Sequence, residues 1–273
     1  MPEGPEVKIL VDQLNKKLKK STILSLEINS GRYSKKKPDS FNSFISSLPL
    51  KIESVNCKGK FIWFELSNDW MIWNTLGLSG GWKTEKTKHG HITLKSKLNG
   101  KELILYYDDY RNFGTLKFVN KKTDLEKKLK DLGCDVLGNE FTKDYCLNLL
   151  NKKINQKKTL PEVLMNQKSF CGVGNYLKSE ILYQSKISPF RLISELNDEE
   201  KENIFKNTKE IAYQSYKKGG ASVRDFSDLD NEKGLYSNIL KVYFQKEDPL
   251  GNKVIKETTK DKRTTHWVPE IQI

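Results

Sequence analysis

The sequence has few residues that could hold a metal ion or form a disulfide. It contains four cysteines and three histidines in 273 residues. The cysteines are scattered, and no two of them form a Cys-x-x-Cys pair: Cys57, Cys134, Cys146 and Cys171. A structural zinc site needs four clustered ligands. The sequence therefore predicts no metal, no other cofactor and no disulfide, with free thiols in the core.

Long apolar runs are also lacking. No stretch approaches the roughly 18 apolar residues that a membrane-spanning helix needs. The first ten residues, MPEGPEVKIL, carry two acids and no apolar run of the kind found in a signal peptide. These absences predict a soluble, intracellular protein that is not secreted and has no membrane partner.

Basic residues, in contrast, are abundant. Lys and Arg together number 48 against 35 Asp and Glu, which gives a formal net charge of +13. Such an excess favours a polyanionic partner, most often nucleic acid. A lysine-rich proteome would produce the same excess, so charge alone leaves both explanations open. The 12 Phe, 11 Tyr and 5 Trp supply enough bulky apolar material for two folded domains.

The first 120 residues predict one helix followed by antiparallel strands. Residues 6–20 place apolar side chains on one face at helical spacing. Strand-like runs follow at 60–66, 70–73, 92–94, 103–107 and 115–119. Asn99-Gly100 separates two regions of this kind and predicts a tight hairpin turn.

The remainder predicts mostly helices. The polar stretch 121–158 predicts a helix over part of 123–132 and a linker over the rest. Further helices are expected at 161–169, 175–185 and 197–218, the last with Asn197 as its N-cap. Residues 239–273 predict strands around a turn at 248–252.

Pro2 offers unusual chemistry at the start of the chain. If Met1 is removed, Pro2 becomes a free secondary amine with a pKa of about 7.7–8, so that a useful fraction is neutral near pH 7. A neutral amine can attack a sugar carbon and form a cationic iminium. Glu3 lies next to it and could donate or accept the proton. A Met-Pro start without chemical function is the alternative, because it is common.

Motifs along almost the whole chain resemble, in order, those of the formamidopyrimidine-DNA glycosylase and endonuclease VIII (Fpg/Nei) superfamily. They are MPEGPEV at the start, CKGKF at 57–61, LGLSG at 76–80, KHGH at 88–91, DYRNFG at 109–114, MNQK at 165–168, GVGN at 172–175 and KRTTH at 262–266. The resemblance implies an α+β fold of two domains. These are an N-terminal helix with an antiparallel β-sandwich, and a helical helix-two-turn-helix domain that carries a β-hairpin finger.

The resemblance also implies domain boundaries. The catalytic β-sandwich is expected over 1–122, a helical linker over 123–158, the helix-two-turn-helix domain over 159–238 and the finger over 239–273.

Catalytic roles follow from the same resemblance. Pro2 is expected to attack C1′ of the damaged nucleotide and form a Schiff base, with Glu3 assisting base loss and sugar ring opening. Lys60 matches the family's catalytic lysine, although alone it could be one solvated lysine among many. Glu6 is expected to support the site. β-Elimination and then δ-elimination would cleave the strand.

Other residues are expected to bind DNA. A flipped nucleotide leaves a void that inserted side chains can fill, and the resemblance assigns this role to Leu78, Arg111 and Phe113. Leu78 and Phe113 could instead be core residues. His89 resembles a DNA-contacting histidine, although it could be a surface residue without a role.

Two further contacts are expected in the helical domain. The glycines of the GVGN motif would let the backbone and the following helix N-terminus approach a phosphate. Asn175 and Lys168 are expected to contact the DNA backbone, which would position DNA without reading sequence. A plain helix hairpin is the alternative for this motif.

The finger departs from the common pattern because it contains no cysteine. Leu250, Val268 and Ile271 stand near the places expected for zinc ligands, so apolar packing could replace the metal, as in the zincless finger of some Nei-like enzymes. Arg263 at the hairpin tip is expected to contact phosphates and to donate a proton in δ-elimination. A finger that only stabilises the fold is the alternative.

The sequence thus predicts a bifunctional DNA glycosylase/AP lyase of base excision repair. Its expected partner is damaged DNA, double- or single-stranded, and it is expected to be a monomer. The zincless finger favours oxidised pyrimidines and hydantoins as substrates. Residues 219–245 are about as long as the loop that covers an oxidised purine in Fpg, so 8-oxoguanine and formamidopyrimidine remain an alternative. A non-catalytic damaged-DNA binding protein is the alternative from another class.

Overall fold

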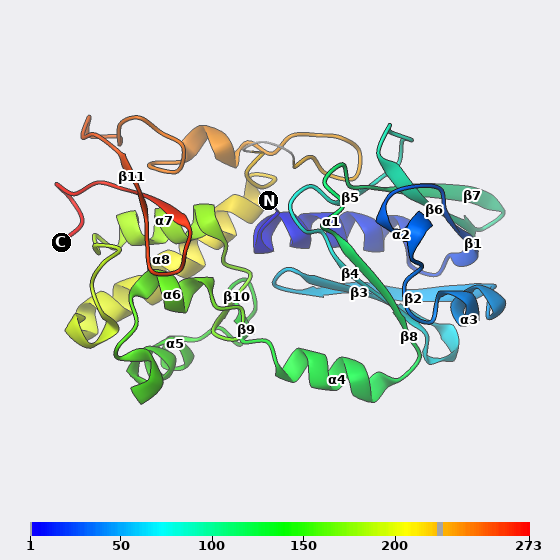
Figure 1. Ribbon diagram of the computed structural model, residues 1–273, viewed down its shortest axis with the longest axis horizontal. Helices are drawn as coiled ribbons and strands as arrows, with labels where there is room; N and C mark the ends of the chain where they lie inside the picture. The colour runs from blue at the N-terminus through cyan, green and yellow to red at the C-terminus, as the bar shows by residue number, and fades with distance from the viewer. Residues whose placement is uncertain (1, 223–225) are drawn as a thin grey trace. The chain divides into compact units, whose positions relative to one another are not determined.

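The computed structural model describes residues 2–222 and 226–273, which form two compact units (Figure 1). The first unit comprises Pro2, residues 6–130 and residues 219–235. The second comprises residues 3–5, 131–218 and 236–273. Among the described helices, none combines the length and the apolar character of a membrane span.

Helix α1 (Gly4–Leu18) confirms the amphipathic helix predicted at the start of the chain. Its apolar side chains are almost fully buried in the core of the first unit: Val7, Leu10, Val11, Leu14 and Leu18. Glu6 lies in the first turn and Lys16 in the last, where each charge interacts favourably with the helix dipole.

Eight antiparallel strands build the rest of the first unit. They are β1 (Thr22–Ile28), β2 (Leu50–Lys58), β3 (Phe61–Leu66), β4 (Met71–Thr75), β5 (Gly81–Lys83), β6 (Gly90–Leu98), β7 (Lys101–Asp108) and β8 (Thr115–Val119), in the spatial order β5-β7-β6-β1-β2-β3-β4-β8. Only two residue pairs join β1 to β2, so the sheet divides into two four-stranded halves. Helix α1 runs between these halves in Figure 1, and both halves contribute to one core. The predicted helix plus antiparallel sandwich is confirmed.

Strands β1 and β2 were not predicted, and β-bulges explain why. The pairing register shifts between Ile23 and Ser25 in β1, and between Ile52 and Ser54 in β2. An extra residue breaks the alternation of buried and exposed side chains that identifies a strand in a sequence. The short helices α2 (Arg32–Lys35) and α3 (Phe41–Ser46) were also missed.

The predicted Asn99-Gly100 turn is confirmed. It joins β6 to β7 with Leu98 opposite Lys101, and both turn residues have positive φ, 49° and 83°. This is the conformation of a two-residue turn that Asn and Gly tolerate best.

The predicted linker contains more structure than expected. Helix α4 (Lys122–Lys130) matches the prediction and buries Leu125 against the first unit. Helix α5 (Lys143–Asn151) was missed, although its signals are present: Thr142 accepts a cap hydrogen bond from Tyr145 N, and three apolar residues share its buried face. The 3-10 turn η2 (Lys153–Asn155) follows.

The second unit contains the helices expected after residue 160. They are α6 (Leu160–Met165), α7 (Asn175–Gln184) and α8 (Asp198–Lys217), with the short strands β9 (Cys134–Asp135) and β10 (Phe170–Cys171) pairing in parallel. Asn197 caps α8 as predicted, because its side chain accepts from Glu200 N at 2.9 Å. Helix α6 ends earlier than predicted, since Asn166 adopts an extended conformation.

The last segment forms the finger, β11 (Ile255–Thr258) paired with β12 (Thr264–Trp267). The predicted turn at 248–252 exists, with Asp248 N donating to Asn252 O at 2.9 Å. It is flanked by a single bridge between Glu247 and Lys253 rather than by strands. The hairpin that carries the strands turns instead at residues 259–263, which places Arg263 at its tip as predicted.

Candidate functional site

The carboxylate of Glu3 receives the free amides at the start of α7. Gly174 N donates to it at 2.7 Å, Tyr176 N at 2.9 Å and Leu177 N at 3.3 Å. Glu3 is 2% exposed, so these hydrogen bonds and the positive end of the helix dipole stabilise a buried negative charge. Glu3 is thus the anion that these three amides bind, and an approach of the motif to a phosphate stays a prediction.

The turn before α7 is shaped for this contact. Gln167 spans it, accepting from Gly172 N at 3.1 Å and donating to Val173 O at 2.9 Å. Gly172 has a φ of +103°, and a Cβ at Gly174 would lie 2.3 Å from the Glu3 carboxyl carbon. Gly4 N also donates to Gly172 O at 2.8 Å. The two glycines are therefore required for close approach of the N-terminal segment, a use of glycine that the sequence signalled without naming its partner.

Pro2 and Glu6, on either side of this segment, are both buried. Met1, whose removal the predicted chemistry requires, lies outside the described residues. Glu6 accepts from Ala221 N at 2.7 Å, and a Cβ at Gly220 would lie 2.9 Å from its side chain. Glu6 thus holds the backbone at the start of residues 219–235. Its supporting role stays a prediction, as does the nucleophilic role of Pro2.

Lys60 lies in the two-residue turn between β2 and β3, next to Gly59 with its φ of +54°. The turn is tight, since Lys58 pairs directly with Phe61. Lys60 is half-buried. Its catalytic role stays a prediction.

Two loops of the first unit are packed against each other. The Asp109 carboxylate joins the two loops. It accepts a hydrogen bond from Ser79 Oγ of the 76–80 loop at 2.7 Å and one from Gly114 N of its own loop at 2.7 Å. Ser79 Oγ also accepts from Arg111 N at 3.1 Å. A Cβ at Gly77 would lie 2.6 Å from the backbone of Phe113. Sequence reasoning treated these motifs separately, and the structure joins them through a buried carboxylate that it had not singled out.

The predicted void-filling residues lie on these joined loops. Phe113 is 54% exposed, which excludes the alternative that it is a core residue. The exposed Arg111 guanidinium lies 5.2 Å from the centre of the Phe113 ring, and Leu78 is half-buried. His89 is close by, since its carbonyl accepts from Asp109 N at 3.1 Å and its ring contacts Tyr110. The structure therefore brings all four predicted residues together, and insertion into DNA stays a prediction.

In the second unit, Asn175 connects α7 to the finger. Its Nδ2 donates to Thr264 O at 2.9 Å. Lys168 is exposed on the turn before β10, and Arg263 is exposed at the finger tip. Contact of these three residues with DNA stays a prediction.

A buried ion pair, which sequence reasoning missed, also holds the finger on α7. Lys178 Nζ lies 2.7 Å from Asp261 Oδ2, and their side chains are 0% and 3% exposed. Asp261 also accepts from Thr259 Oγ1 at 2.5 Å, within the turn that carries Arg263. Burial lowers the pKa of Lys178, and Asp261 and then Glu3 act to raise it. The sequence of α7 gives no signal for this pair, because polar residues such as Ser179 and Glu180 stand beside Lys178.

Apolar packing stabilises the base of the finger. Val242, Val254 and Val268 form a small core with Tyr183, and Ile271 packs against it. The predicted apolar packing of Val268 and Ile271 is confirmed, and their correspondence to zinc ligands stays a prediction.

Leu250 is 74% exposed, so its predicted place in this core is wrong. Asp248 organises that turn instead: it accepts from Leu250 N, Asn252 N and Tyr183 Oη at 2.9, 2.8 and 3.0 Å. In the part of the chain that the structure describes, no group of three His, Cys, Asp or Glu could hold a metal ion. Cys146 and Cys171 are buried as predicted, but Cys57 and Cys134 are only half-buried.

His266 on β12 makes the stability of the second unit dependent on pH. Neither ring nitrogen has a hydrogen-bond partner among the described residues, and the ring packs against Tyr243 and Phe244. Burial, followed by nearby Lys256 and Lys178, lowers its pKa to about 4. Between pH 6.5 and 4 the unfolded chain therefore binds a proton that the folded chain does not, so stability falls as the pH is lowered.

We expect the His266→Phe variant to lose this dependence. Urea unfolding at pH 7 and at pH 4 should show that the wild-type protein loses up to about 3 kcal/mol more than His266→Phe. A His89→Phe control should behave as wild type. Equal losses in wild type and His266→Phe would contradict the burial of a neutral imidazole.

Residues 219–235 belong to the first unit although they follow α8 in the chain. The buried Lys83 ammonium donates to Ser227 O at 2.8 Å and to Asp228 O at 2.6 Å. Leu229 is fully buried in the core, and Lys17 pairs with Asp230 at 2.8 Å. The described part of this segment is therefore fixed to the sandwich. Residues 223–225 of the loop compared above with an oxidised-purine cover lie outside the described residues.

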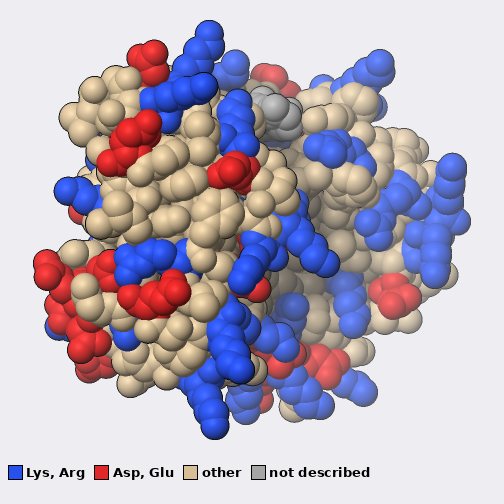
Figure 2. All heavy atoms as spheres, turned by 60° about the vertical axis from the view of Figure 1, so that its left-hand side comes forward, with Lys and Arg blue, Asp and Glu red and all other residues tan. Residues whose placement is uncertain are grey.

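Figure 2 shows basic side chains spread over the face drawn, with acidic side chains among them and a group of acids at its left edge. This distribution agrees with the net charge of +13. It gives long-range attraction for a polyanion.

Known proteins resemble the chain over its full length. Three family models match: the formamidopyrimidine-DNA glycosylase N-terminal domain at residues 1–116, its H2TH domain at 132–227 and its C-terminal domain at 238–273. The formamidopyrimidine-DNA glycosylase of Shouchella clausii is 31% identical over 281 aligned positions, covering 100% of this chain and 99% of that protein.

Two solved structures of the Lactococcus lactis enzyme agree with this match. One is its complex with DNA that contains an abasic site, and the other is a complex of a mutant with Fapy-dG-containing DNA. Each has a TM-score of 0.85 at 25% identity and covers 99% of both chains. The protein therefore belongs to the formamidopyrimidine-DNA glycosylase family of DNA N-glycosylases with AP lyase activity.

Proposed function

We propose that this DNA repair glycosylase excises oxidised bases through a Schiff base formed by Pro2. The observation that supports the proposal most is the set of hydrogen bonds that fix the Glu3 carboxylate. Three backbone amides of α7 hold a buried carboxylate beside Pro2 in the chain. A fixed carboxylate next to a secondary amine supplies a nucleophile and a proton-transfer group in adjacent positions. The substrate is damaged DNA, as in the Lactococcus lactis complexes.

The chemistry begins when the Pro2 nitrogen, neutral after loss of Met1, attacks C1′. The N–C1′ bond forms, the bond from C1′ to the base breaks, and the base leaves with a proton. Glu3 takes the proton that the Pro2 nitrogen loses when it bonds to C1′. The sugar ring then opens: the nitrogen lone pair forms the C1′=N bond of the iminium, the C1′–O4′ electron pair moves to O4′, and O4′ receives that proton from Glu3. This cation acidifies C2′-H, so loss of that proton expels the 3′ phosphate. A second elimination, with Arg263 as proton donor, releases the 5′ phosphate, and water hydrolyses the Schiff base.

Formamidopyrimidine lesions are the first substrate that we propose. The family match and the Fapy-dG complex of the Lactococcus lactis enzyme support this choice. Oxidised pyrimidines and hydantoins are the second substrate class that we propose, and the apolar core of the cysteine-free finger supports them by its resemblance to Nei-like fingers. Excision rates on duplexes with Fapy-dG, 8-oxoguanine, dihydrouracil or spiroiminodihydantoin would show which of the two substrate classes is preferred.

Borohydride trapping tests the shared mechanism. We expect wild-type protein to form a covalent adduct with abasic-site DNA in the presence of borohydride, because reduction fixes the iminium. Mass spectrometry of the digested adduct should place the sugar on the nitrogen of Pro2 and show that Met1 is absent.

Specific binding of abasic DNA without any adduct would contradict the proposal and favour a non-catalytic damaged-DNA binding protein. An adduct on a lysine such as Lys60 would retain the lyase but overturn the assignment of Pro2. Protein with Met1 deliberately retained serves as the control and should give no adduct.

A further inference from the structure

A large basic cavity lies on the first unit, and none of the residues that line it was assigned a role in catalysis above. Its volume is about 620 Å³, within the range of about 300–1,000 Å³ typical of ligand sites. Helix α2 and the chain after it form one wall, strands β3, β4 and β8 form the floor, and α4 contributes one lysine. Of the motifs discussed above, only CKGKF contributes a lining residue, Phe61.

The cavity is lined by five cations and only one acid. The cations are Arg32, Lys36, Lys37, Lys117 and Lys128, and the acid is Asp39. Within the described residues, no carboxylate lies within ion-pair distance of any of these five cations. The cavity therefore presents unneutralised charge that suits a ligand with several negative groups.

Aromatic side chains form part of the same lining. Phe61, Trp73 and Tyr33 all border the cavity. Lys117 Nζ lies 5.5 Å from the centre of the Trp73 ring, and Lys128 Nζ lies 5.5 Å from that of Phe61. The Thr75 and Thr115 hydroxyls, 2.6 Å apart, add hydrogen-bonding groups between the strands. Cations interleaved with aromatic rings are the combination that binds unpaired nucleotides, through phosphates and stacked bases.

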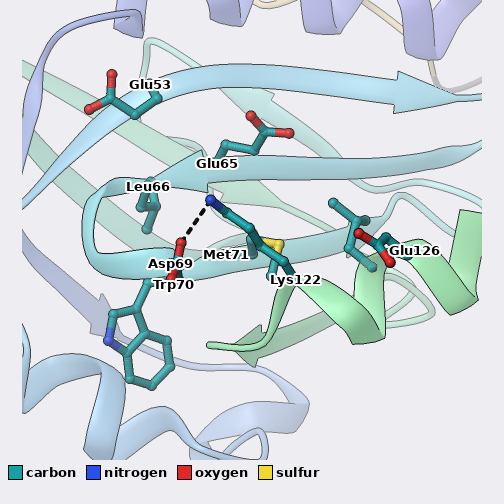
Figure 3. Close-up of a pocket in the computed structure, with 9 residues that line it drawn as sticks. Glu53, Glu65, Leu66, Asp69, Trp70, Met71, Lys122 and Glu126 are labelled. Carbon is teal, nitrogen blue, oxygen red and sulfur yellow. Dashed lines mark ion pairs between the residues drawn. The ribbon is translucent and has the colours of Figure 1, made fainter.

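A second cavity on the same face of the sheet has the opposite character. Because alternate residues of a strand share a face, Glu65 and Met71 lie on the side that carries Phe61 and Trp73. This cavity, of about 250 Å³, is lined by four acids and one lysine, and Figure 3 shows the Lys122–Asp69 ion pair across it. The face is therefore basic at one end and acidic at the other, so a polyanion is attracted only to the first.

The basic cavity is also continuous with the predicted DNA-inserting loops. Arg32 N donates to Asn112 Oδ1 at 3.0 Å, and its guanidinium donates to Gly114 O at 3.3 Å. These contacts tie the cavity wall to the loop that carries Arg111 and Phe113. A strand that leaves those loops can thus enter the cavity directly.

We propose that this cavity binds a nucleotide of a single nucleic-acid strand that flanks the lesion site. The phosphates contact Lys36, Lys117 and Arg32, and the base packs on Trp73 and Tyr33. The site adds affinity for unpaired DNA without reading sequence. The link to lesions rests on the proposed function, whereas strand binding itself does not.

The test measures the binding of a fluorescent 15-nucleotide oligothymidine to two double variants of the protein, in each of which two lysines are replaced by glutamate. We expect Lys36→Glu/Lys117→Glu to weaken binding at least about tenfold and to reduce the salt slope by about 1.4, the value for two phosphate contacts of a single strand. The control variant is Lys19→Glu/Lys101→Glu, which replaces two exposed lysines of the same unit outside the cavity. It has the same net charge as the first variant and should change binding less than about threefold. Trp73→Leu should weaken binding about fivefold or more without changing the salt slope.

Excision of a lesion from a short duplex is measured in parallel and should stay within about twofold of wild type in Lys36→Glu/Lys117→Glu. Equal weakening by the two charge-reversal pairs would overturn the proposal, since it would show only the effect of net charge. Loss of excision together with strand binding would also overturn it, because the cavity would then be part of the lesion site. So would thymidine monophosphate competing as well as the oligonucleotide does. If wild-type protein excises no base, the oligothymidine comparison still stands by itself.

Discussion

Replacement of Glu3 by glutamine should lower the rate of base excision by about 10²- to 10⁴-fold, the range that general acid–base groups contribute. Glutamine keeps the shape of the side chain but cannot release a proton to O4′. Its amide group would also face backbone N–H donors of α7, where the carboxylate accepts from Gly174 and Tyr176. Single-turnover excision from a lesion-containing duplex measures the effect. Pro2→Gly is expected to abolish excision by the same assay.

A structural effect of the substitution must be separated from the chemical one. Excision should fall far more than borohydride trapping on preformed abasic DNA, since the base has already left that substrate. Misfolding would reduce both alike. Glu162→Gln is a matched control, because Glu162 also accepts a backbone amide, Thr159 N at 2.8 Å, at the start of a helix of the same unit. Near-wild-type excision by Glu3→Gln would end the assignment of Glu3.

The binding of Glu3 by the amides at the start of α7 also shows which features of the site could be predicted from the sequence and which could not. The GVGN motif correctly predicted a tight turn with amides exposed at a helix start. It did not reveal that Glu3, which lies 171 residues before Gly174 in the chain, accepts these amides, and contact of the motif with a phosphate stays a prediction. Local spacing reports backbone shape, whereas the identity of a distant partner depends on the tertiary fold.

Elements with strong local signals were predicted well. Helix α8 has a capping box at Asn197 and Glu200 and acids in its first turn, so both ends could be placed. Strands β1 and β2 have weaker signals, because their bulges interrupt the period of two. Helix α5 was taken for linker because lysine and asparagine dominate its surroundings, although Thr142 and three apolar residues mark it.

In the finger, too, features with a local sequence signal could be predicted, whereas features that depend on the tertiary fold could not. Val268 and Ile271 could be assigned to its core from their place opposite expected metal ligands, but Leu250 could not, since a single turn decides whether it faces in or out. Asp248 takes over that turn through hydrogen bonds to backbone amides. The pairing of Lys178 with Asp261, which spans 83 residues, has no local signal at all.

Removal of either partner of that ion pair should destabilise the second unit strongly. Lys178→Met leaves the Asp261 carboxylate buried without its cation, and Asp261→Leu leaves the ammonium buried alone. Each change should lower the free energy of unfolding by about 3–5 kcal/mol, because an uncompensated buried charge is costly. The double variant should lose less than either single variant, since it removes both charges together. Urea unfolding of the four proteins gives the coupling energy directly.

The four proteins also test what the pair does for the finger tip. Asp261 organises the turn through Thr259 Oγ1 at 2.5 Å, and Thr259 N donates to Arg263 O at 3.1 Å. Without this carboxylate, Arg263 is no longer held in one position, and a proton donor must be placed within hydrogen-bond reach to act. Asp261→Asn, which retains an acceptor for Thr259, should therefore keep more δ-elimination product on abasic DNA than Asp261→Leu, with β-elimination and trapping retained in both.

Two results would count against this account of the finger. One is additive losses of stability in the double variant, which would mean that Lys178 and Asp261 do not interact in the folded protein. The other is an unchanged ratio of δ- to β-elimination products in a folded Asp261→Leu variant. In that case the turn would hold Arg263 through its backbone alone, and the ion pair would serve only to fix β11 and β12 on α7.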